Sequence, residues 1–144
     1  MGLNLKKALA NMKKDLKAFK NIEFEYTHDE DGIDASAANV SLNGFDDDIY
    51  ISFYAFDSGS AFATAYFDKI EPSYDAYNLI NKFNDDNIFL KAFISEKGFL
   101  TFKHVRRRCD EKDFDNFASD FLGEIASLTD DETVCALVAM TDSE

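Results

Sequence analysis

Apolar side chains recur at helical spacing in the first twenty residues. They stand every three or four positions and are Leu5, Leu9, Met12, Leu16 and Phe19. This spacing places them on one face of an amphipathic helix, with six lysines around the rest. A basic amphipathic helix can lie on an anionic membrane or dock on an acidic partner. We expect this one to cover the domain's own sheet, with its lysines facing the acidic remainder of the chain.

After this helix the hydrophobic period changes to two, which predicts strands. Apolar and polar residues alternate from 22 to 28, as in a strand with one solvated face. Residues 40–42 indicate a second strand, although the small residues at 35–39 weaken the pattern before them. The runs 49–56 and 61–67 predict two more strands, and the Asp-Ser-Gly-Ser sequence between them is typical of a hairpin.

A short helix and a second hairpin follow. Pro72 suits the first turn of a helix, and this helix is expected to end near residues 84–87. Strands at 88–95 and 99–105 are then joined around Gly98. Because these strands also come as a hairpin, we expect them to pair in antiparallel fashion.

Two helices are predicted at the end of the chain. The first spans residues 111–128, with Asp110 as its N-cap. A short last helix around residues 134–138 is expected to follow, with Asp130 or Asp131 as its N-cap.

The order of these elements predicts the fold class. Up to the short last helix, the order is α-β-β-β-β-α-β-β-α. Strands that come as hairpins favour an antiparallel sheet, so we predict an α+β fold. Its sheet has about five to six strands, and the amphipathic helices pack on it. No linker or repeat divides the chain, so residues 1–144 are expected to form a single domain.

Charge narrows the classes of partner. The chain has a formal net charge of -13, but residues 1–20 hold six Lys and one Asp, a net of +5. The other residues hold 9 basic and 27 acidic side chains, a net of -18. Such a body repels nucleic acid, so we expect no nucleic-acid partner. It attracts basic protein or peptide partners, although the charge can also serve solubility alone.

Cysteines and hydropathy bear on the compartment. Cys109 and Cys135 show no spacing of a disulfide framework or a zinc site, which favours a reducing compartment. No stretch approaches the roughly 20 apolar residues of a membrane span, and the first residues do not resemble a signal peptide. We therefore expect a cytoplasmic protein with no membrane partner.

Catalytic and metal chemistry have little support. His28 and His104 are the only histidines, and neither stands beside a nucleophile in a recognisable pattern. The sequence at 29–32 resembles part of a calcium loop, but the first and last loop positions would be Thr27 and Ala38. Both positions should be carboxylates, and the flanking segments are predicted strands rather than helices, so a calcium loop is not expected. Residues 46–48 favour a solvated turn over a cation site. We predict no catalytic residue, no metal site and no cofactor.

The basic run Lys-His-Val-Arg-Arg-Arg-Cys-Asp at 103–110 lies between a predicted strand and a predicted helix. We expect alternate arginines among Arg106, Arg107 and Arg108 to pair with surface carboxylates, each exposed pair contributing ~0–1 kcal/mol. Alanine at all three positions is then expected to leave the fold intact. Cys109 would lie just before a helix N-terminus, where its thiol pKa can fall, so a reactive thiol is an alternative.

Large apolar side chains occupy both faces of the strands between residues 49 and 67. Ile49, Ile51 and Phe53 alternate with aromatic residues, whereas a half-solvated strand has one polar face. The second face must be covered by a helix of the same chain or by a partner. The candidate partner-binding or interface residues are Tyr50, Tyr54, Phe56, Phe62 and Tyr66.

The segment from Ala76 to Leu128 carries a resemblance to a known family. A short helix ending in Asn-Lys-Phe-Asn leads to Ile-Phe-Leu-Lys-Ala-Phe-Ile-Ser and Gly-Phe-Leu-Thr-Phe, and an aromatic-rich helix with Phe-Asp-Asn-Phe at 114–117 follows. In this order, and in size and acidity, the chain resembles the YbjN-like family, whose fold is similar to that of type III secretion chaperones. The resemblance implies a domain that dimerises and binds a protein or peptide, without catalysis. Residues 134–140 depart from the pattern.

We therefore predict a non-enzymatic protein-binding domain, chaperone-like or regulatory, that acts as a homodimer. One alternative is an acidic immunity or antitoxin protein that neutralises a basic toxin. An alternative from another class is a small hydrolase or thiol enzyme that uses Cys109.

Overall fold

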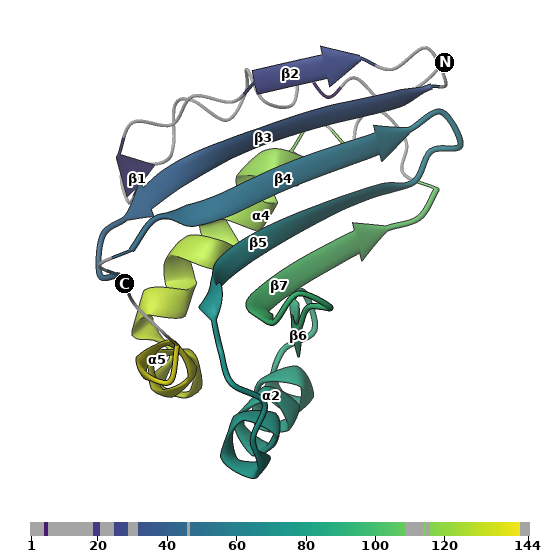
Figure 1. Ribbon diagram of the computed structural model, residues 1–144. Helices are drawn as coiled ribbons and strands as arrows, with labels where there is room; N and C mark the ends of the chain where they lie inside the picture. Colours follow the sequence, from purple (N-terminus) through teal and green to yellow (C-terminus); the bar gives the residue numbers. More distant parts are fainter. Residues whose placement is uncertain are drawn as a thin grey trace.

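In the part of the chain that the structure describes, the fold is an antiparallel sheet with three helices on one face (Figure 1). The computed structural model describes residues 5, 19–20, 25–28, 32–45, 47–108, 114 and 116–141. The predicted α+β class is confirmed, and so is the antiparallel pairing of the strands. Within the described residues, no helix is long and apolar enough to cross a membrane.

Five strands form the body of the sheet, and two short segments pair with one of its edges. The strands of the body, in their order across the sheet, are β3 (Ile33–Leu42), β4 (Ile49–Phe56), β5 (Ala61–Lys69), β7 (Phe99–Arg106) and β6 (Lys91–Ile94). The short segments β1 (Phe19–Lys20) and β2 (Glu25–His28) both pair with the outer side of β3. Counting them, the described sheet has seven strands, close to the predicted number.

The turns between the strands follow their sequences. The β4–β5 hairpin closes with a hydrogen bond from the Phe56 backbone nitrogen to the Ser60 carbonyl oxygen, 2.9 Å long. Gly98, in the β6–β7 hairpin, has a φ of 92°, a conformation that glycine adopts without steric cost. A register shift in β5 between Tyr66 and Lys69 marks a bulge, where the strand bends.

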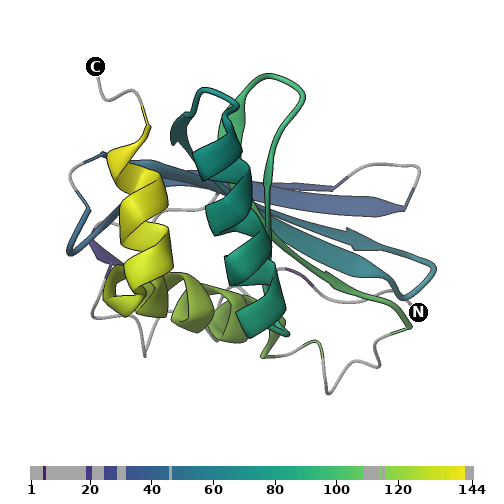
Figure 2. The same cartoon turned by 90° about the horizontal axis from the view of Figure 1, so that it is seen from below.

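Three helices lie on the same side of the sheet, as Figure 2 shows from below. They are α2 (Tyr74–Asp86), α4 (Phe117–Ser127) and α5 (Glu132–Ala139), and a 3-10 turn, η1 (Leu128–Asp130), joins the last two. Ser73 caps α2 by accepting a hydrogen bond from the Ala76 nitrogen, and Asp131 caps α5 through the nitrogens of Thr133 and Val134. Asp131, one of the two residues predicted for this role, is thus the N-cap of the last helix.

Phenylalanine rings join the helices to the sheet. Phe53 of β4 is fully buried and meets Phe117 and Phe121 of α4 edge-on, with ring centroids 6.1 and 5.7 Å apart. Phe102 of β7 meets Phe83 of α2 in the same way at 5.1 Å. Edge-to-face pairs of this kind add to the hydrophobic stabilisation of a core.

Several predicted boundaries need correction. Phe19 belongs to β1 and not to a helix, because its backbone pairs with Leu42. The strand predicted at 88–95 begins only at Lys91, because α2 extends to Asp86 and Ile88 lies in the connecting loop with its side chain 98% exposed.

The strand predicted at 40–42 is in fact ten residues long. The small residues at 35–39 belong to it because their backbones all pair with β4, and those of 35–37 also pair with β2, so pairing outweighs weak strand propensity. Leu5, from the first predicted helix, is fully buried in the core. The rest of that helix up to residue 18, the cap Asp110, and Cys109 lie outside the described residues.

Candidate protein-binding site

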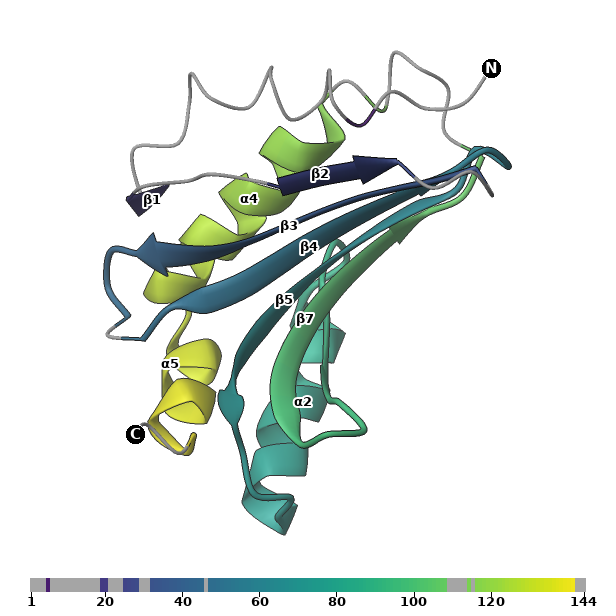
Figure 3. The same ribbon diagram turned by 45° about the horizontal axis from the view of Figure 1, so that its top comes forward.

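The two faces of the sheet differ in what covers them. Figure 3 shows α2, α4 and α5 on one side of the sheet. Ile49, Ile51 and Phe53 point to that side and are buried. Tyr50 and Tyr54 alternate with them along β4 and therefore point to the opposite side, which no described helix covers. The predicted division of β4 into two apolar faces is confirmed.

On this open side, aromatic rings from β4 and β5 stack on one another across the strands. We call this surface the aromatic face, and it consists of Tyr50, Tyr54, Phe56, Phe62 and Tyr66. The rings of Tyr54 and Phe62 stack with centroids 4.7 Å apart, and those of Phe56 and Phe62 with centroids 5.8 Å apart. Tyr50 lies opposite Tyr66 in the strand register, with ring centroids 6.2 Å apart. The structure thus brings all five candidate residues together on one surface.

The aromatic face continues onto the neighbouring strands. Val105 of β7 is paired with Phe62, and its side chain is 50% exposed. Phe93 of β6, on the same side, is 37% exposed. The ammonium group of Lys103 lies 4.6 Å from the centre of the Phe62 ring, close enough for a cation–π contact. The exposed apolar surface therefore crosses from β4 to the edge of the sheet.

Two small polar residues divide the aromatic face. Ser52 and Thr64 lie opposite each other between the Tyr54–Phe62 pair and the Tyr50–Tyr66 pair. Their hydroxyl groups share a hydrogen bond of 2.6 Å and are almost completely buried. Each buried hydroxyl group therefore has a hydrogen-bond partner, and this bond links β4 to β5 between the two aromatic pairs.

A pocket of about 640 Å³ lies at the Tyr50–Tyr66 end of the aromatic face. We call it the acidic pocket. Its walls carry three carboxylates, one lysine, four aromatic residues and two uncharged polar residues. The wall residues are Asn39, Asp48, Tyr50, Tyr66, Phe67, Asp68, Ser95, Glu96, Lys97 and Phe99. This grouping of carboxylates was not predicted from the sequence, because Asp48, Asp68 and Glu96 come from three separate parts of the chain.

Asp68 has an unusual environment at the rim of this pocket. Partial burial raises the pKa of Asp68 to about 6, and a hydrogen bond and charge repulsion from Asp47 act in the same direction. The protonated Asp68 can donate a hydrogen bond to the Asp47 carboxylate. Once Asp68 ionises, two negative charges face each other, which destabilises the folded state near neutral pH.

We expect Asp68→Asn to stabilise the protein at pH 7 but not at pH 4. The folded-state pKa of about 6 lies above the ordinary value of 3.8, so the folded state retains a proton that the unfolded state releases. The contribution of Asp68 to stability is thus fully present below about pH 4 and is lost as pH rises through 6. Asparagine keeps a donor toward Asp47 and carries no charge. Urea unfolding of both proteins at the two pH values measures the difference, and equal gains at both values would contradict this explanation.

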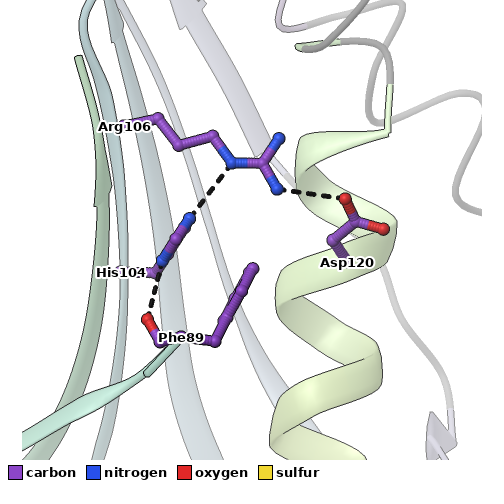
Figure 4. A network of polar contacts seen from close by, with 4 residues as sticks. All are labelled: Phe89, His104, Arg106 and Asp120. Carbon is purple, nitrogen blue, oxygen red and sulfur yellow. Dashed lines mark hydrogen bonds and ion pairs between the residues drawn. The ribbon is translucent and has the colours of Figure 1, made fainter. Parts of the chain in front are cut away.

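His104 belongs to a closed network on the helix side of the sheet (Figure 4). Its Nδ1 donates to the Phe89 carbonyl oxygen at 2.7 Å, and its Nε2 accepts from Arg106 Nε at 3.1 Å. Arg106 in turn forms an ion pair with Asp120 of α4 at 3.0 Å. Burial lowers the pKa of His104, which favours the neutral ring that this bonding pattern requires. With both ring nitrogens bonded, His104 has a structural position in this network.

Two residues of the basic run at 103–110, His104 and Arg106, take part in this network. The predicted pairing of its arginines with carboxylates is confirmed for Arg106, which is the last residue of β7 rather than part of the connector. Arg107 and Arg108 are exposed, and Arg108 has a φ of 57°.

The described residues offer little for metal or thiol chemistry. Among them, no group of three or more His, Cys, Asp or Glu side chains could hold a metal ion. Cys135 is exposed, and its thiol lies 3.5 Å from the Thr129 carbonyl oxygen. The proposed reactive Cys109 lies outside the described residues, so that alternative stays a prediction.

Comparisons with protein-family models, with curated proteins and with solved structures gave no match to this chain. The resemblance to the YbjN-like family therefore stays a prediction.

Proposed function

We propose that this protein is a non-enzymatic protein-binding domain and that its partner docks on the aromatic face. The observation that carries the proposal is a set of stacked aromatic rings on a sheet face that no described helix covers; Tyr50 is 44% exposed and the other four residues are partly exposed. Monomeric soluble proteins rarely expose large contiguous apolar patches, and such patches are typical of interaction sites. Aromatic residues are also enriched among the residues that dominate binding energy at interfaces.

The rigidity of the aromatic face supports this proposal. Tyr54 and Phe62 stack on each other, and Ser52 and Thr64 hold the strands between the aromatic pairs. Rings that are already ordered lose little conformational entropy when a partner covers them. A partner that lays apolar side chains across β4, β5 and β7 would bury Val105 and Phe93 together with the rings.

The partner that we propose is another protein of basic character, because the chain carries a net charge of -13. An immunity or antitoxin protein bound to a basic toxin is one form of this function. The predicted homodimer stays a prediction. It would place a second copy on the same face, and the experiment below therefore includes the oligomeric state as a readout.

Threonine at two positions of the open side is expected to weaken partner binding about thirtyfold. The variant Tyr54→Thr with Val105→Thr removes apolar contact area while keeping residues that favour strands. A tyrosine at the centre of an interface commonly contributes 2 kcal/mol or more to binding, and ~2 kcal/mol corresponds to about thirtyfold. Proteins captured from the native lysate by the wild type and by the variant are quantified by mass spectrometry, and the affinity of each enriched protein is then measured with purified material.

The matched control is Tyr74→Gln with Tyr77→Gln on α2. These tyrosines are 80% and 50% exposed, but they lie on the helix side of the molecule. The control should retain the partner. If the two double variants behave alike, the aromatic face is not the binding surface. Light scattering compares the oligomeric states of the three proteins. If the wild type and the control are dimers while the Tyr54 and Val105 variant is a monomer, the aromatic face binds a second copy, and the proposal of a basic partner is wrong.

A further inference from the structure

The acidic pocket places charged side chains at one end of the aromatic face. Its carboxylates are Asp48, Asp68 and Glu96, and Lys97 is the one cationic side chain among its described wall residues. The local net charge of these four side chains is therefore -2 when all are ionised. Two tyrosine rings, Tyr50 and Tyr66, form the part of the wall that continues into the aromatic face.

This combination fits an organic cation better than a metal ion or an anion. Carboxylates in a partly enclosed site pair with ammonium or guanidinium groups, and a tyrosine ring attracts the same groups through its negative face. A guanidinium is planar and weakly hydrated, so it can stack on a ring and pair with a carboxylate at the same time. The described acidic residues include no cluster suited to a metal ion.

We propose that the acidic pocket binds an arginine or lysine side chain of a basic partner segment that lies across the aromatic face. This inference rests on the proposed function, and it adds the chemistry by which the partner is chosen. Apolar side chains of the segment would cover Tyr54, Phe62 and Val105. A cationic side chain farther along the segment would enter the pocket between Tyr50, Tyr66 and the carboxylates.

The repulsion between Asp68, in the wall of the pocket, and the neighbouring Asp47 supports this inference. Asp68 and Asp47 repel each other once both are ionised. A bound cation offsets this repulsion, because an opposite charge nearby favours the ionised carboxylates. Binding is then strongest above about pH 6, where Asp68 is charged, and weakens as the pH falls below that value.

The probe is a hexapeptide with alternating arginine and leucine, and its matched control has citrulline in place of arginine. Citrulline keeps the shape of the side chain but has no charge. Calorimetry with the full chain should give at least tenfold tighter binding of the arginine peptide. Signals from the Tyr50 and Tyr66 rings in NMR spectra should shift only with that peptide.

Variants of the pocket show whether the peptide is attracted by the carboxylates of the pocket or by the negative charge of the whole protein. The variant Asp68→Asn with Glu96→Gln should bind the arginine peptide about tenfold more weakly than the wild type, since charge-assisted contacts are lost. The control Asp85→Asn with Asp130→Asn removes the same charge from exposed positions outside the pocket and should stay within about twofold. Equal weakening in both variants, or equal binding of both peptides by the wild type, would overturn the proposal.

The outcome is distinguishable from failure of the proposed function. The variant Tyr54→Thr with Val105→Thr leaves every wall residue of the acidic pocket unchanged. If that variant loses the native partner while the pocket variant keeps it, the aromatic face binds proteins and the pocket does not select a cation. If only the pocket variant loses the partner, the pocket is the binding site and the aromatic face is not.

Discussion

Replacing Phe53 with alanine is expected to lower the free energy of unfolding by about 3–5 kcal/mol. Phe53 is fully buried, and its ring meets Phe117 and Phe121 of α4 edge-on. The substitution removes the ring that joins β4 to α4, and it leaves a cavity that the surrounding rings fill only in part. No other single side chain described above connects β4 to α4 through two aromatic pairs.

Urea unfolding monitored by circular dichroism measures this loss. The control Tyr74→Ala removes an aromatic ring that is 80% exposed and should change stability by no more than about 0.5 kcal/mol. A loss below about 1 kcal/mol for Phe53→Ala would show that the helix does not pack on the sheet as described.

Replacing Arg106 with alanine is expected to cost about 2 kcal/mol, the second-largest effect on stability. The guanidinium donates to His104, pairs with Asp120, and lies 5.8 and 5.3 Å from the ring centres of Phe89 and Phe117. An ion pair with a half-exposed carboxylate contributes little by itself. The hydrogen bond to a partly buried ring and the two cation–π contacts each add up to about 1 kcal/mol.

This prediction refines the expectation from the sequence that alanine at all three arginine positions leaves the fold intact. Arg107→Ala should be nearly neutral, because its side chain is exposed. Replacing Arg106 with lysine should restore only part of the loss, since an ammonium group cannot bond His104 and Asp120 in the same planar arrangement. If Arg106→Ala proves as neutral as Arg107→Ala, the network in Figure 4 does not stabilise the fold.

Periodicity predicted the fold class and most elements, but it failed where pairing partners decide the structure. The small residues at 35–39 have little strand propensity, yet all of them pair with β4 and residues 35–37 also pair with β2, so they are part of β3. Phe19 fits the helical spacing of the residues before it, but a backbone partner at Leu42 places it in a strand. Such long-range pairing leaves no local signal in the sequence.

The candidate site was predictable only in part. The aromatic face follows from alternation along β4 and β5, because residues two apart in a strand share a face. That α2, α4 and α5 would all lie on the other side did not follow from their patterns, since an amphipathic helix can cover either face. The acidic pocket was missed because Asp48, Asp68 and Glu96 are far apart in sequence and meet only through strand order and the bulge after Tyr66.

Site-specific photo-crosslinking in cells tests the central claim, that the aromatic face is the partner-binding surface, most directly. A benzophenone amino acid replaces Val105 on the open side of the sheet in one strain and Tyr77 on α2 in another; both positions are 50% exposed in the native chain. We predict a discrete crosslinked species, whose second component is a basic protein, from position 105 and none from position 77. The absence of a crosslink from position 105, or the same species from both positions, would contradict the account.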